Sequence, residues 1–361
     1  AAFNDRQIDV PEELLVGVDT TALAVPPLQT KEAFGGTITL TQPLLRAAVF
    51  PAVQAATKAW RAAQADEARA RQQVRAATAR AYWGLLAARS GLEVAGSNLE
   101  LAEAHRGLAQ RRLDAGIEGR RALLQAELGV SRASRERLSA TEAVAQAEAA
   151  WRVVLGDEPV RELRAPEPPA VPASLEEALV LAEARRPDLR AAEERQGAVE
   201  RQRAAGDMGW FPTLDLALQA RFNLSPTVFN PVPAQAGLGL QLHWEIFDGG
   251  LRIARSQGAA ARTRLARLDV DARRRDARQE VRAAWLRHQR AVVAVDAVEA
   301  EVALAEEDLD LAERGLAAGA GTLLDVQGAR LSTASARLAR IRERTARDLA
   351  AIDLLLAMGT L

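Results

Sequence analysis

The sequence predicts a mainly α-helical fold with a smaller portion of membrane-type β-strands. Three observations lead to this prediction: an internal duplication, two very long proline-poor stretches, and short runs of strict alternation between apolar and polar residues. Only 4% of the residues are aromatic. Such a composition favours long helices in close contact over a thick globular core.

Composition and charge exclude several classes of protein. The 47 basic and 48 acidic side chains nearly cancel, so no basic field is available to hold nucleic acid. The absence of cysteine excludes disulfides and thiolate metal sites. The sequence contains no run of about twenty apolar residues, so no transmembrane helix is predicted. The first residues lack the features of a signal peptide, so we expect a mature, trimmed or truncated chain.

The duplication joins the two halves of the chain at one spacing. Gly116 and Gly319 stand in similar contexts, at an offset of 319 − 116 = 203. The same offset relates further pairs over some eighty residues: Tyr82 and Trp285, Leu92 and Val295, Leu99 and Val302, Leu108 and Leu311, Ala126 and Ala329, and Leu155-Gly156 and Met358-Gly359. Self-similarity at a fixed spacing predicts that each half forms the same structural unit.

Two long helices are predicted, from about Ala48 to Ala115 and from about Gly250 to Ala318, because no proline follows Pro51 in either stretch. At 1.5 Å per residue each helix is on the order of 100 Å long. In the second stretch Val295, Val302, Leu309 and Leu316 recur every seven residues. A seven-residue spacing predicts left-handed supercoiling against neighbouring helices.

Each long helix is followed closely by another helix. Gly116 and Gly319 end the long helices, and new helices begin near Arg120 and Leu323, so the short connections predict antiparallel hairpins. The return helices, to Leu155 and Met358, are only about half as long. A third helix, capped at Ser174 and running to about Asp207, is expected to cover the remainder, with the proline-rich stretch before it forming an excursion along the rod.

Two runs between the third helix and the second long helix alternate strictly. Residues 213–222 and 237–246 each place leucines on one face and polar residues or glycine on the other. Each run has the length of a tilted membrane strand. A soluble hairpin is the alternative, but an isolated hairpin is unstable in water, and lipid requires that such strands close into a barrel. The residues expected to face lipid are Ile38, Leu40, Leu214, Leu216, Leu218, Leu238, Leu240, Leu242 and Trp244.

A third strand is expected from Phe34 to Thr41, leading through Pro43 into the first long helix. Its partner should precede it. Applying the offset places the first-copy counterparts of 174–222 almost wholly before residue 1, so we expect a segment of roughly forty to fifty residues to be missing at the N-terminus. Phe3-Asn4 would be the last trace of that strand, and residues 5–33 an exposed loop.

At this point the chain resembles the TolC family of outer-membrane efflux proteins, or outer membrane factors. The likeness covers almost the whole chain. It is carried by the duplication, by Trp210-Phe211-Pro212, by Trp244-Glu245-Ile246-Phe247-Asp248-Gly249-Gly250, which is similar to the family's "lfDGG" signature, and by the hairpin turns at Gly116 and at Gly319 to Val326. The first copy departs from the signature with Leu45-Arg46-Ala47-Ala48.

The resemblance implies a homotrimer in the outer membrane of a Gram-negative bacterium. Each protomer would give four strands to a twelve-stranded β-barrel and its helices to a periplasmic α-barrel. The family implies a passive exit duct that docks with a periplasmic adaptor and with an inner-membrane pump or ABC transporter, in a tripartite efflux pump or a type I secretion system. No cofactor, metal or nucleic acid is implied.

The resemblance also assigns roles to the hairpin turns. They would form the periplasmic tip that contacts the adaptor, at Gly116, Ile117, Gly319, Ala320, Gly321 and Thr322. Asp325 matches a pore-constricting aspartate, and three copies would form a carboxylate ring that favours cations. Where many members carry another acidic residue, this chain has Gly328. The alternative for Asp325 is a solvated residue or one that starts a helix, and Gly116 and Gly319 are expected to be structural helix ends.

Two other classes of function explain the sequence less well. An enzyme is disfavoured because Glu176-Glu177, Glu193-Glu194 and Glu306-Glu307 are adjacent pairs that point to different sides of a helix, and no phosphate loop or nucleophile elbow occurs. His243 is expected on the polar face of a strand, and His105 and His288 are expected to be solvated helix residues. A soluble periplasmic coiled-coil scaffold or adaptor explains the helices but not the alternating strands.

The sequence predicts a division of the chain into six segments. They are a strand region with an extracellular loop (1–47), a first long hairpin (48–156), a proline-rich equatorial excursion (157–173), a half-helix (174–208), a membrane β-hairpin (209–248) and a second long hairpin (249–361).

Overall fold

The computed structural model describes residues 2–3, 7–11, 27–30, 32–117, 119–156, 163–164, 166–167, 169–225, 227–228 and 232–361. The chain divides into two compact units. The first joins Ala1–Ala59 to Gln196–Ala266, and the second joins Trp60–Arg195 to Arg267–Leu361. The first unit contains the strands, and most of the helical length lies in the second.

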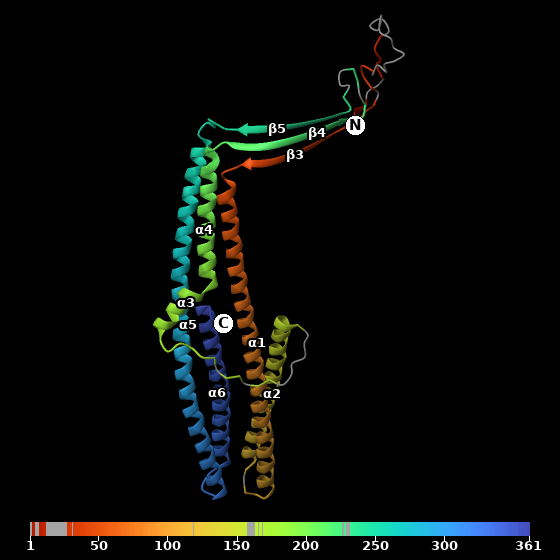
Figure 1. Cartoon of the computed structure of the whole chain (residues 1–361). Coiled ribbons are helices and arrows are strands. Elements are labelled where there is room, and N and C mark those ends of the chain that lie inside the picture. The colour runs from red at the N-terminus through yellow and green to blue at the C-terminus, as the bar shows by residue number, and fades with distance from the viewer. Residues whose placement is uncertain are drawn as a thin grey trace. The chain divides into compact units, whose positions relative to one another are not determined.

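The first unit contains a three-stranded antiparallel sheet in the order β3-β4-β5 (Figure 1). Strand β3 spans Gly35–Leu45, β4 spans Thr213–Asn223 and β5 spans Ala234–His243. β3 pairs with β4, although some 170 residues separate them in sequence, and β4 pairs with β5 as a hairpin. The two strands predicted from alternation and the third strand expected from Phe34 are therefore confirmed.

Two short strands precede β3. Strand β1 (Ala2–Phe3) pairs antiparallel with β2 (Glu32–Ala33), and an isolated bridge joins Ile8 to Gln29. The expectation for Phe3-Asn4 is met only in that Phe3 belongs to a strand, since Asn4 lies outside the described residues. Most of the expected loop at 5–33 also lies outside them. The expected loss of an N-terminal segment stays a prediction.

The helices confirm the duplication. Helix α1 covers Val49–Asp114 and α5 covers Leu251–Ala317, with 66 and 67 residues. Helices α2 (Arg120–Leu155) and α6 (Leu323–Met358) have 36 residues each, and their bounds differ by 323 − 120 = 358 − 155 = 203. None of the helices within the described residues is apolar enough over a sufficient length to cross a membrane.

Glycines occupy equivalent turning points in the two copies. Gly116 and Gly319 have φ values of 72° and 74°, and Gly156 and Gly359 have values of 77° and 74°. These values lie in the left-handed region, which costs little only for glycine, so each glycine ends a helix without strain. The predicted role of Gly116 and Gly319 as helix ends is confirmed.

The single third helix predicted from Ser174 to about Asp207 was wrong in one respect. The structure contains two helices, α3 (Leu175–Arg185) and α4 (Pro187–Asp207), followed by a 3₁₀ turn at Met208–Trp210. Pro187 has no N–H group and disfavours the helical conformation at the preceding residue. Arg186 accordingly has φ −64° and ψ 119°. The Ser174 cap is confirmed, because its side chain accepts a hydrogen bond from the Glu177 N–H at 3.2 Å.

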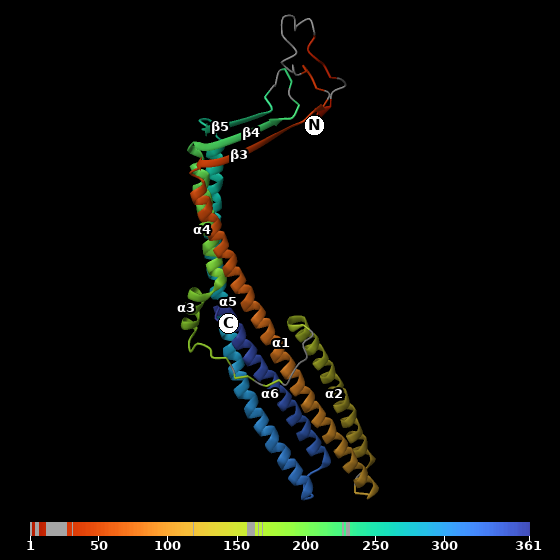
Figure 2. The same cartoon turned by 45° about the vertical axis from the view of Figure 1, so that its right-hand side comes forward.

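Alanine dominates the buried part of the second unit. Ala178 and Ala182 of α3 pack with Val281 and Ala284 of α5 and with Leu354 of α6. On its other side α6 contributes Ile352 to a cluster with Ala76 and Trp83 of α1. Helix α6 therefore lies between α5 and α1, as both views show (Figures 1 and 2).

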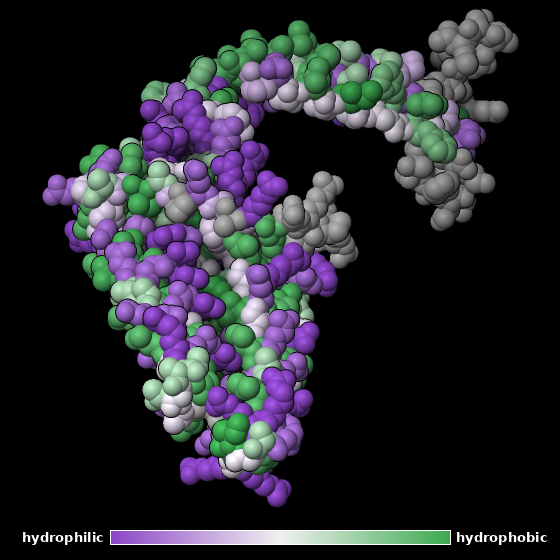
Figure 3. Space-filling model, turned by 90° about the horizontal axis from the view of Figure 1, so that it is seen from below, coloured by the Kyte–Doolittle hydropathy of each residue, from purple (hydrophilic) through white to green (hydrophobic). Residues whose placement is uncertain are grey.

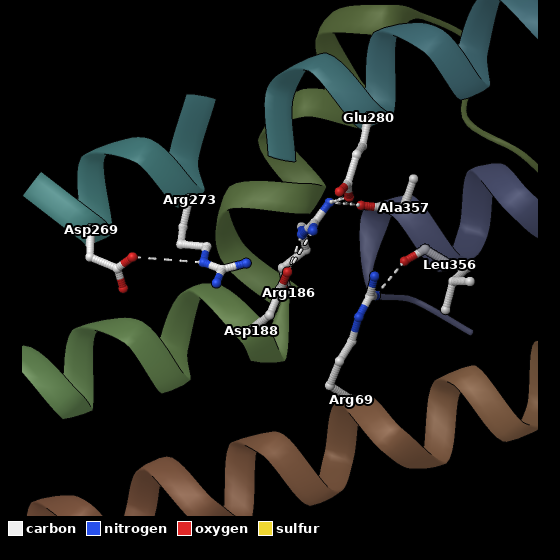
Figure 4. A network of polar contacts seen from close by, with 8 residues as sticks. All are labelled: Arg69, Arg186, Asp188, Asp269, Arg273, Glu280, Leu356 and Ala357. Carbon is white, nitrogen blue, oxygen red and sulfur yellow. Dashed lines mark hydrogen bonds and ion pairs between the residues drawn. The ribbon is translucent and has the colours of Figure 1, made fainter. Parts of the chain in front are cut away.

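Polar side chains hold the C-terminal end of α6 (Figure 4). Arg186, only 3% exposed at its side chain, forms ion pairs with Asp188 at 2.5 Å and Glu280 at 2.8 Å, and it donates to the carbonyl of Ala357 at 2.9 Å. Arg69 of α1 donates to the carbonyl of Leu356 at 2.8 Å. Cations at these carbonyls satisfy groups that have no partner within the helix and oppose the negative end of its dipole.

Ionisation at this junction is strongly favoured. Burial works against the charged form of Asp188, but the adjacent Arg186 guanidinium outweighs it and lowers the pKa of the Asp188 carboxyl. The pKa of Arg186 is raised because its two carboxylate partners outweigh its burial. Both groups are therefore charged at neutral pH, as a buried arginine with two acidic partners requires.

The expectation that His105 and His288 are solvated was wrong. Both are only 7% exposed, whereas His243 lies at the exposed end of β5. Burial and the nearby Arg347 lower the pKa of His288, which favours the neutral imidazole. On an alanine-rich helix the sequence pattern does not show which face is buried. The burial of these two histidines therefore cannot be predicted from the sequence.

The proline-rich stretch contacts α1 at one described point. The Tyr82 hydroxyl donates to the carbonyl of Arg164 at 2.5 Å and accepts from the Arg164 N–H at 3.0 Å. Residues 157–162, 165 and 168 lie outside the described residues. The equatorial placement of this stretch, like the six-segment division as a whole, stays a prediction.

The glycines that end α2 and α6, Gly156 and Gly359, allow a matched test of packing. In Gly359→Ala the new Cβ would lie 2.8 Å from the Cα of Arg186, whereas at Gly156 it would meet nothing within 4 Å. Both substitutions place alanine at a positive φ, which costs about 1 kcal/mol. Overpacking against backbone adds roughly 1–3 kcal/mol in Gly359→Ala alone. Thermal unfolding should show a clearly larger loss for Gly359→Ala, and equal losses would contradict the assigned contact.

Candidate membrane strands and hairpin tips

The register of the sheet places the predicted lipid-facing residues on one face. Leu218 of β4 pairs with Leu40 of β3 on one side and with Leu238 of β5 on the other. Two further leucine pairs join β4 to β5, Leu216 with Leu240 and Leu214 with Leu242. Residues directly opposite each other in a sheet point to the same side. Leu238, Leu240 and Leu242 are 66–71% exposed. The structure thus brings the predicted residues of all three strands together, and Trp244 follows β5 with the same alternation.

The other face of the sheet is polar. It carries Thr37, Thr39, Thr41, Asp215, Gln219, Arg221 and Gln241. Asp215 forms a two-pronged hydrogen-bonded ion pair with Arg46, with N–O distances of 3.0 and 3.1 Å. Figure 3 shows hydrophobic residues gathered along one border of the strand band and paler or hydrophilic residues along the other. A sheet with one apolar and one polar face is suited to separate lipid from water.

The passage from β5 into α5 is held by Asp248. Its carboxylate accepts hydrogen bonds from the N–H groups of Gly250 at 3.1 Å and Arg252 at 2.7 Å, and from Nε of Arg252 at 3.0 Å. Gly249 and Gly250 have φ values of 66° and 89°. The Asp-Gly-Gly motif therefore supplies a helix cap and two residues that turn sharply at little cost.

Arg252 is a residue of this passage that sequence reasoning missed. Its guanidinium lies 4.3 Å from the centre of the Trp210 ring and donates to the carbonyls of Gly209 and Ile246. Both Arg252 and Asp248 are at most 8% exposed at their side chains. The spacing of four residues from Asp248 was the available signal.

The first hairpin tip is a glycine turn without a side-chain cap. The N–H of Gly116 donates to the carbonyl of Leu113, and that of Ile117 to the carbonyl of Arg112, both at 2.9 Å. Gly119 directly precedes α2, at the N-cap position, and offers no side-chain acceptor. Ile117 is 70% exposed at this tip. An exposed large apolar side chain at a turn is available for contact with another protein.

The second tip is tighter. The N–H groups of Ala320 and Gly321 both donate to the carbonyl of Gly315, at 2.9 and 3.0 Å. A Cβ at position 321 would lie 3.0 Å from the Leu316 nitrogen. Glycine is therefore needed at 321 for the close approach of two backbone segments, in addition to the positive φ at Gly319.

Asp325 starts α6 as part of a capping box. Its carboxylate accepts from the Thr322 N–H at 2.8 Å and from the Thr322 hydroxyl at 2.7 Å, and the Thr322 hydroxyl accepts from the Asp325 N–H. These hydrogen bonds lower the pKa of Asp325, and the bond from the Thr322 hydroxyl has a larger effect than the bond from the Thr322 N–H. The expected alternative of a helix-start residue is thus observed. The first copy has Ala122 at the equivalent position.

The two tips are in contact with each other within the second unit. Leu316 packs against the buried residues Ala109 and Ala126 of the first hairpin, and Nε2 of Gln327 donates to the carbonyl of Gln125 at 3.3 Å. Among the described residues there is no group of three or more His, Cys, Asp or Glu side chains that could hold a metal ion. The adaptor contact and the pore constriction at these tips stay predictions.

Comparison with known proteins agrees with this geometry. The structure of the MtrE outer membrane channel from Neisseria gonorrhoeae is 21% identical, with a TM-score of 0.75 over 91% of this chain and 79% of that one. VceC from Vibrio cholerae is 20% identical, with a TM-score of 0.73 over 98% of this chain and 84% of that one. At such identities the likeness establishes the fold.

Sequence relatives extend the comparison. Protein CyaE of Bordetella pertussis is 30% identical over 188 residues, which cover 50% of this chain and 40% of CyaE. The match therefore spans less than half the length of that relative. The profile of the outer membrane efflux protein family matches residues 26–157 and 178–360, one stretch in each copy of the duplication. This chain thus belongs to the outer membrane efflux protein family and is a protein of the outer membrane, as its resemblance to the TolC family implied.

Proposed function

We propose that the chain is the protomer of a trimeric, passive exit duct that works with a periplasmic adaptor and an inner-membrane transporter. The observation that carries this proposal is the apolar face of β3, β4 and β5, which leaves leucines more than 60% exposed on the two outer strands. Such a face favours lipid, and lipid tolerates strands only in a closed barrel. Three strands cannot close, so copies of the chain must join their sheets.

The long helices support the same assembly. Helix α5 exposes Leu286, Val293, Leu304 and Leu311, each more than half exposed. Apolar residues spaced by seven on a long helix indicate packing against further helices. In the proposed trimer these residues meet neighbouring protomers, and the helices form the periplasmic part of the duct.

The family and the neighbouring structures support the proposed role as a conduit, since MtrE, CmeC and OprN are described as outer membrane channels. The sequence contains no phosphate-binding loop that would supply energy. We therefore propose that the chain is not an enzyme and that an inner-membrane partner drives transport. A tripartite efflux pump and a type I secretion system are both compatible with this duct.

The hairpin tips are the proposed site of adaptor contact. Gly116, Ile117 and the turn Gly319–Thr322 lie at adjacent tips, and Ile117 offers an exposed apolar anchor. Exposed apolar residues at the centre of a contact carry much of its binding energy. Asp325 is the proposed constriction, because its carboxylate is exposed and ionised beside the second turn.

Conduction tests the proposed function directly. Protein extracted from outer membranes in detergent and added to a planar lipid bilayer should give discrete, ohmic conductance steps, because a closed barrel leaves a water-filled path. Conductance needs no nucleotide if the duct is passive. Protein that stays in the aqueous phase without detergent and leaves the bilayer silent would contradict the proposal and favour a soluble scaffold.

Two neighbouring residues of β5 separate the lipid face from the polar face. Leu240→Arg places a charge on the apolar face and should cost roughly 2–4 kcal/mol if that face meets the bilayer centre. Gln241→Arg places the same charge on the polar face and should be tolerated. The amount of folded protein in purified outer membranes measures both effects. Equal recovery of the two variants would contradict the assignment of the faces.

Asp325 should make the duct prefer cations. Its lowered pKa means that the charge is fully present above the ordinary aspartate value of about 3.9 and is lost only as the pH falls through the lower folded value. Asp325→Asn should shift the reversal potential in a salt gradient toward zero, with cation preference reduced several-fold. In the native protein this preference should not change between pH 8 and pH 5.

Two control variants isolate the charge from the cap. Thr322→Ala removes the hydroxyl that Asp325 bonds but keeps the carboxylate, so it should keep the cation preference. Asp114→Asn removes an exposed charge at the end of α1 beside the first tip. If Asp114→Asn lowers the preference as much as Asp325→Asn does, the constriction is not at Asp325.

A further inference from the structure

A cavity of about 90 Å³ lies between the two hairpins, within the second unit. All four hairpin helices, α1, α2, α5 and α6, contribute to its wall. The apolar part of the wall consists mainly of Leu101, Ala102, Ala126, Ala133, Leu309 and Leu331. Because a protein cavity of about 150 Å³ can hold a benzene ring, this smaller one suits a molecule of about five carbons.

One side chain on the wall has a buried hydrogen-bond donor that is not used. Asn98 lines the cavity from α1, about two helical turns from the buried His105. The amide Nδ2 of Asn98 is buried and has no hydrogen-bond partner among the described residues. A buried donor without a partner costs about 1–3 kcal/mol, which an apolar side chain at position 98 would avoid. A molecule in the cavity that presents an acceptor would remove this cost.

The charged side chains on the wall favour an uncharged ligand. Arg330 and Arg337 of α6 already form ion pairs with glutamates of α5, at 2.6 and 2.9 Å. Arg132 and Glu136 lie one turn apart on α2 and are exposed, so water screens both charges. A charged ligand gains little from such partners, and burying its charge among leucines and alanines is costly. An uncharged ligand avoids that cost.

The second copy of the duplication does not repeat these polar residues. Adding 203 converts Asn98 and His105 into Glu301 and Asp308, which are both exposed. Water satisfies acidic side chains at the surface, whereas the amide of Asn98 is buried beside the other hairpin. The duplication alone therefore does not account for this pair of neutral polar residues on the wall of a cavity.

Gly129 makes room at the same place. It lies inside α2, where glycine costs roughly 0.5–1 kcal/mol relative to alanine, and the second copy has Ser332 at the equivalent position. A Cβ at position 129 would lie 3.1 Å from Nε2 of Gln327. Glycine thus lets the Gln327 side chain cross from α6 to the carbonyl of Gln125, where it forms part of the wall of the cavity.

We propose that this cavity binds a small uncharged organic molecule, with an apolar body of about five carbons and one carbonyl oxygen that accepts a hydrogen bond from Asn98. The apolar body would lie against the leucines and alanines of the wall. Because the molecule would contact both hairpins at once, its binding would oppose their separation. The proposal goes beyond the proposed function, since it requires neither a membrane nor a pore.

Binding of cyclopentanone to the full chain tests the site. The ring of cyclopentanone matches the volume of the cavity, and its carbonyl accepts a hydrogen bond but cannot donate one. Saturation-transfer NMR of the protein in deuterated detergent should show saturable transfer to cyclopentanone at millimolar concentrations, as suits so small a ligand. Cyclopentylamine is the control. It has the same ring but is a cation at neutral pH with donors only, and it should show no saturable transfer.

Three variants locate the binding. Asn98→Leu keeps a side chain of similar size but removes the donor, so cyclopentanone should bind about fivefold more weakly. Ala334→Leu adds volume to the wall of the cavity and should abolish binding. Ser335→Leu places the same side chain on the next residue of α6, which is exposed and does not line the cavity, and it should leave binding unchanged. Circular dichroism checks that each variant is folded, and Asn98→Leu decides alone if Ala334→Leu unfolds.

Several outcomes would overturn the proposal. One is the absence of saturable transfer to cyclopentanone in the native protein, and another is equal transfer to cyclopentylamine. Binding that is as strong in folded Asn98→Leu as in the native protein would show that the amide takes no part. Binding that survives in folded Ala334→Leu would place the ligand elsewhere. None of these results depends on conductance, so the proposed function can fail or stand separately.

Discussion

Close contact between alanine side chains is the interaction on which the helical part of this protein depends. Most of the buried apolar residues in the described chain are alanines, and they let α1, α5 and α6 run side by side over many turns. An alanine buries little surface, so this packing creates no thick core. The larger residues, such as Leu286 and Leu304, are left outside. A helix pair built in this way is complete only when further helices cover it, which links the packing to assembly.

The two copies of the duplication have helices of similar length but differ in the contacts that stabilise the helix ends. Helix α6 ends among Arg69, Arg186 and Glu280, whereas the glycine that ends α2 contacts nothing within 4 Å of its would-be Cβ. Asp248 and Arg252 secure the entry to α5, while the entry to α1 uses an ion pair across to β4, between Arg46 and Asp215. Thr322 and Asp325 cap α6, and α2 starts at an uncapped glycine. Divergence has therefore affected the helix ends more than the helices themselves.

Sequence reasoning succeeded where local patterns determine the structure. The glycines at 116 and 319 predicted the hairpin turns, and alternation predicted which side of each strand is apolar. It failed where contacts between distant segments decide. The pairing of β3 with β4 spans some 170 residues, Arg186 finds its partners on two other helices, and the burial of His288 has no local signature. Pro187 was visible in the sequence, and its effect on Arg186 was underestimated.

The central claim is that this chain functions only as an assembly of copies that closes the sheet around a water-filled path. Native mass spectrometry of the protein, extracted from outer membranes in detergent, tests this claim most directly. The account predicts a single species with three times the mass of the chain, which falls apart when the apolar face of β5 carries a charge. A monodisperse monomer that is soluble without detergent would contradict it.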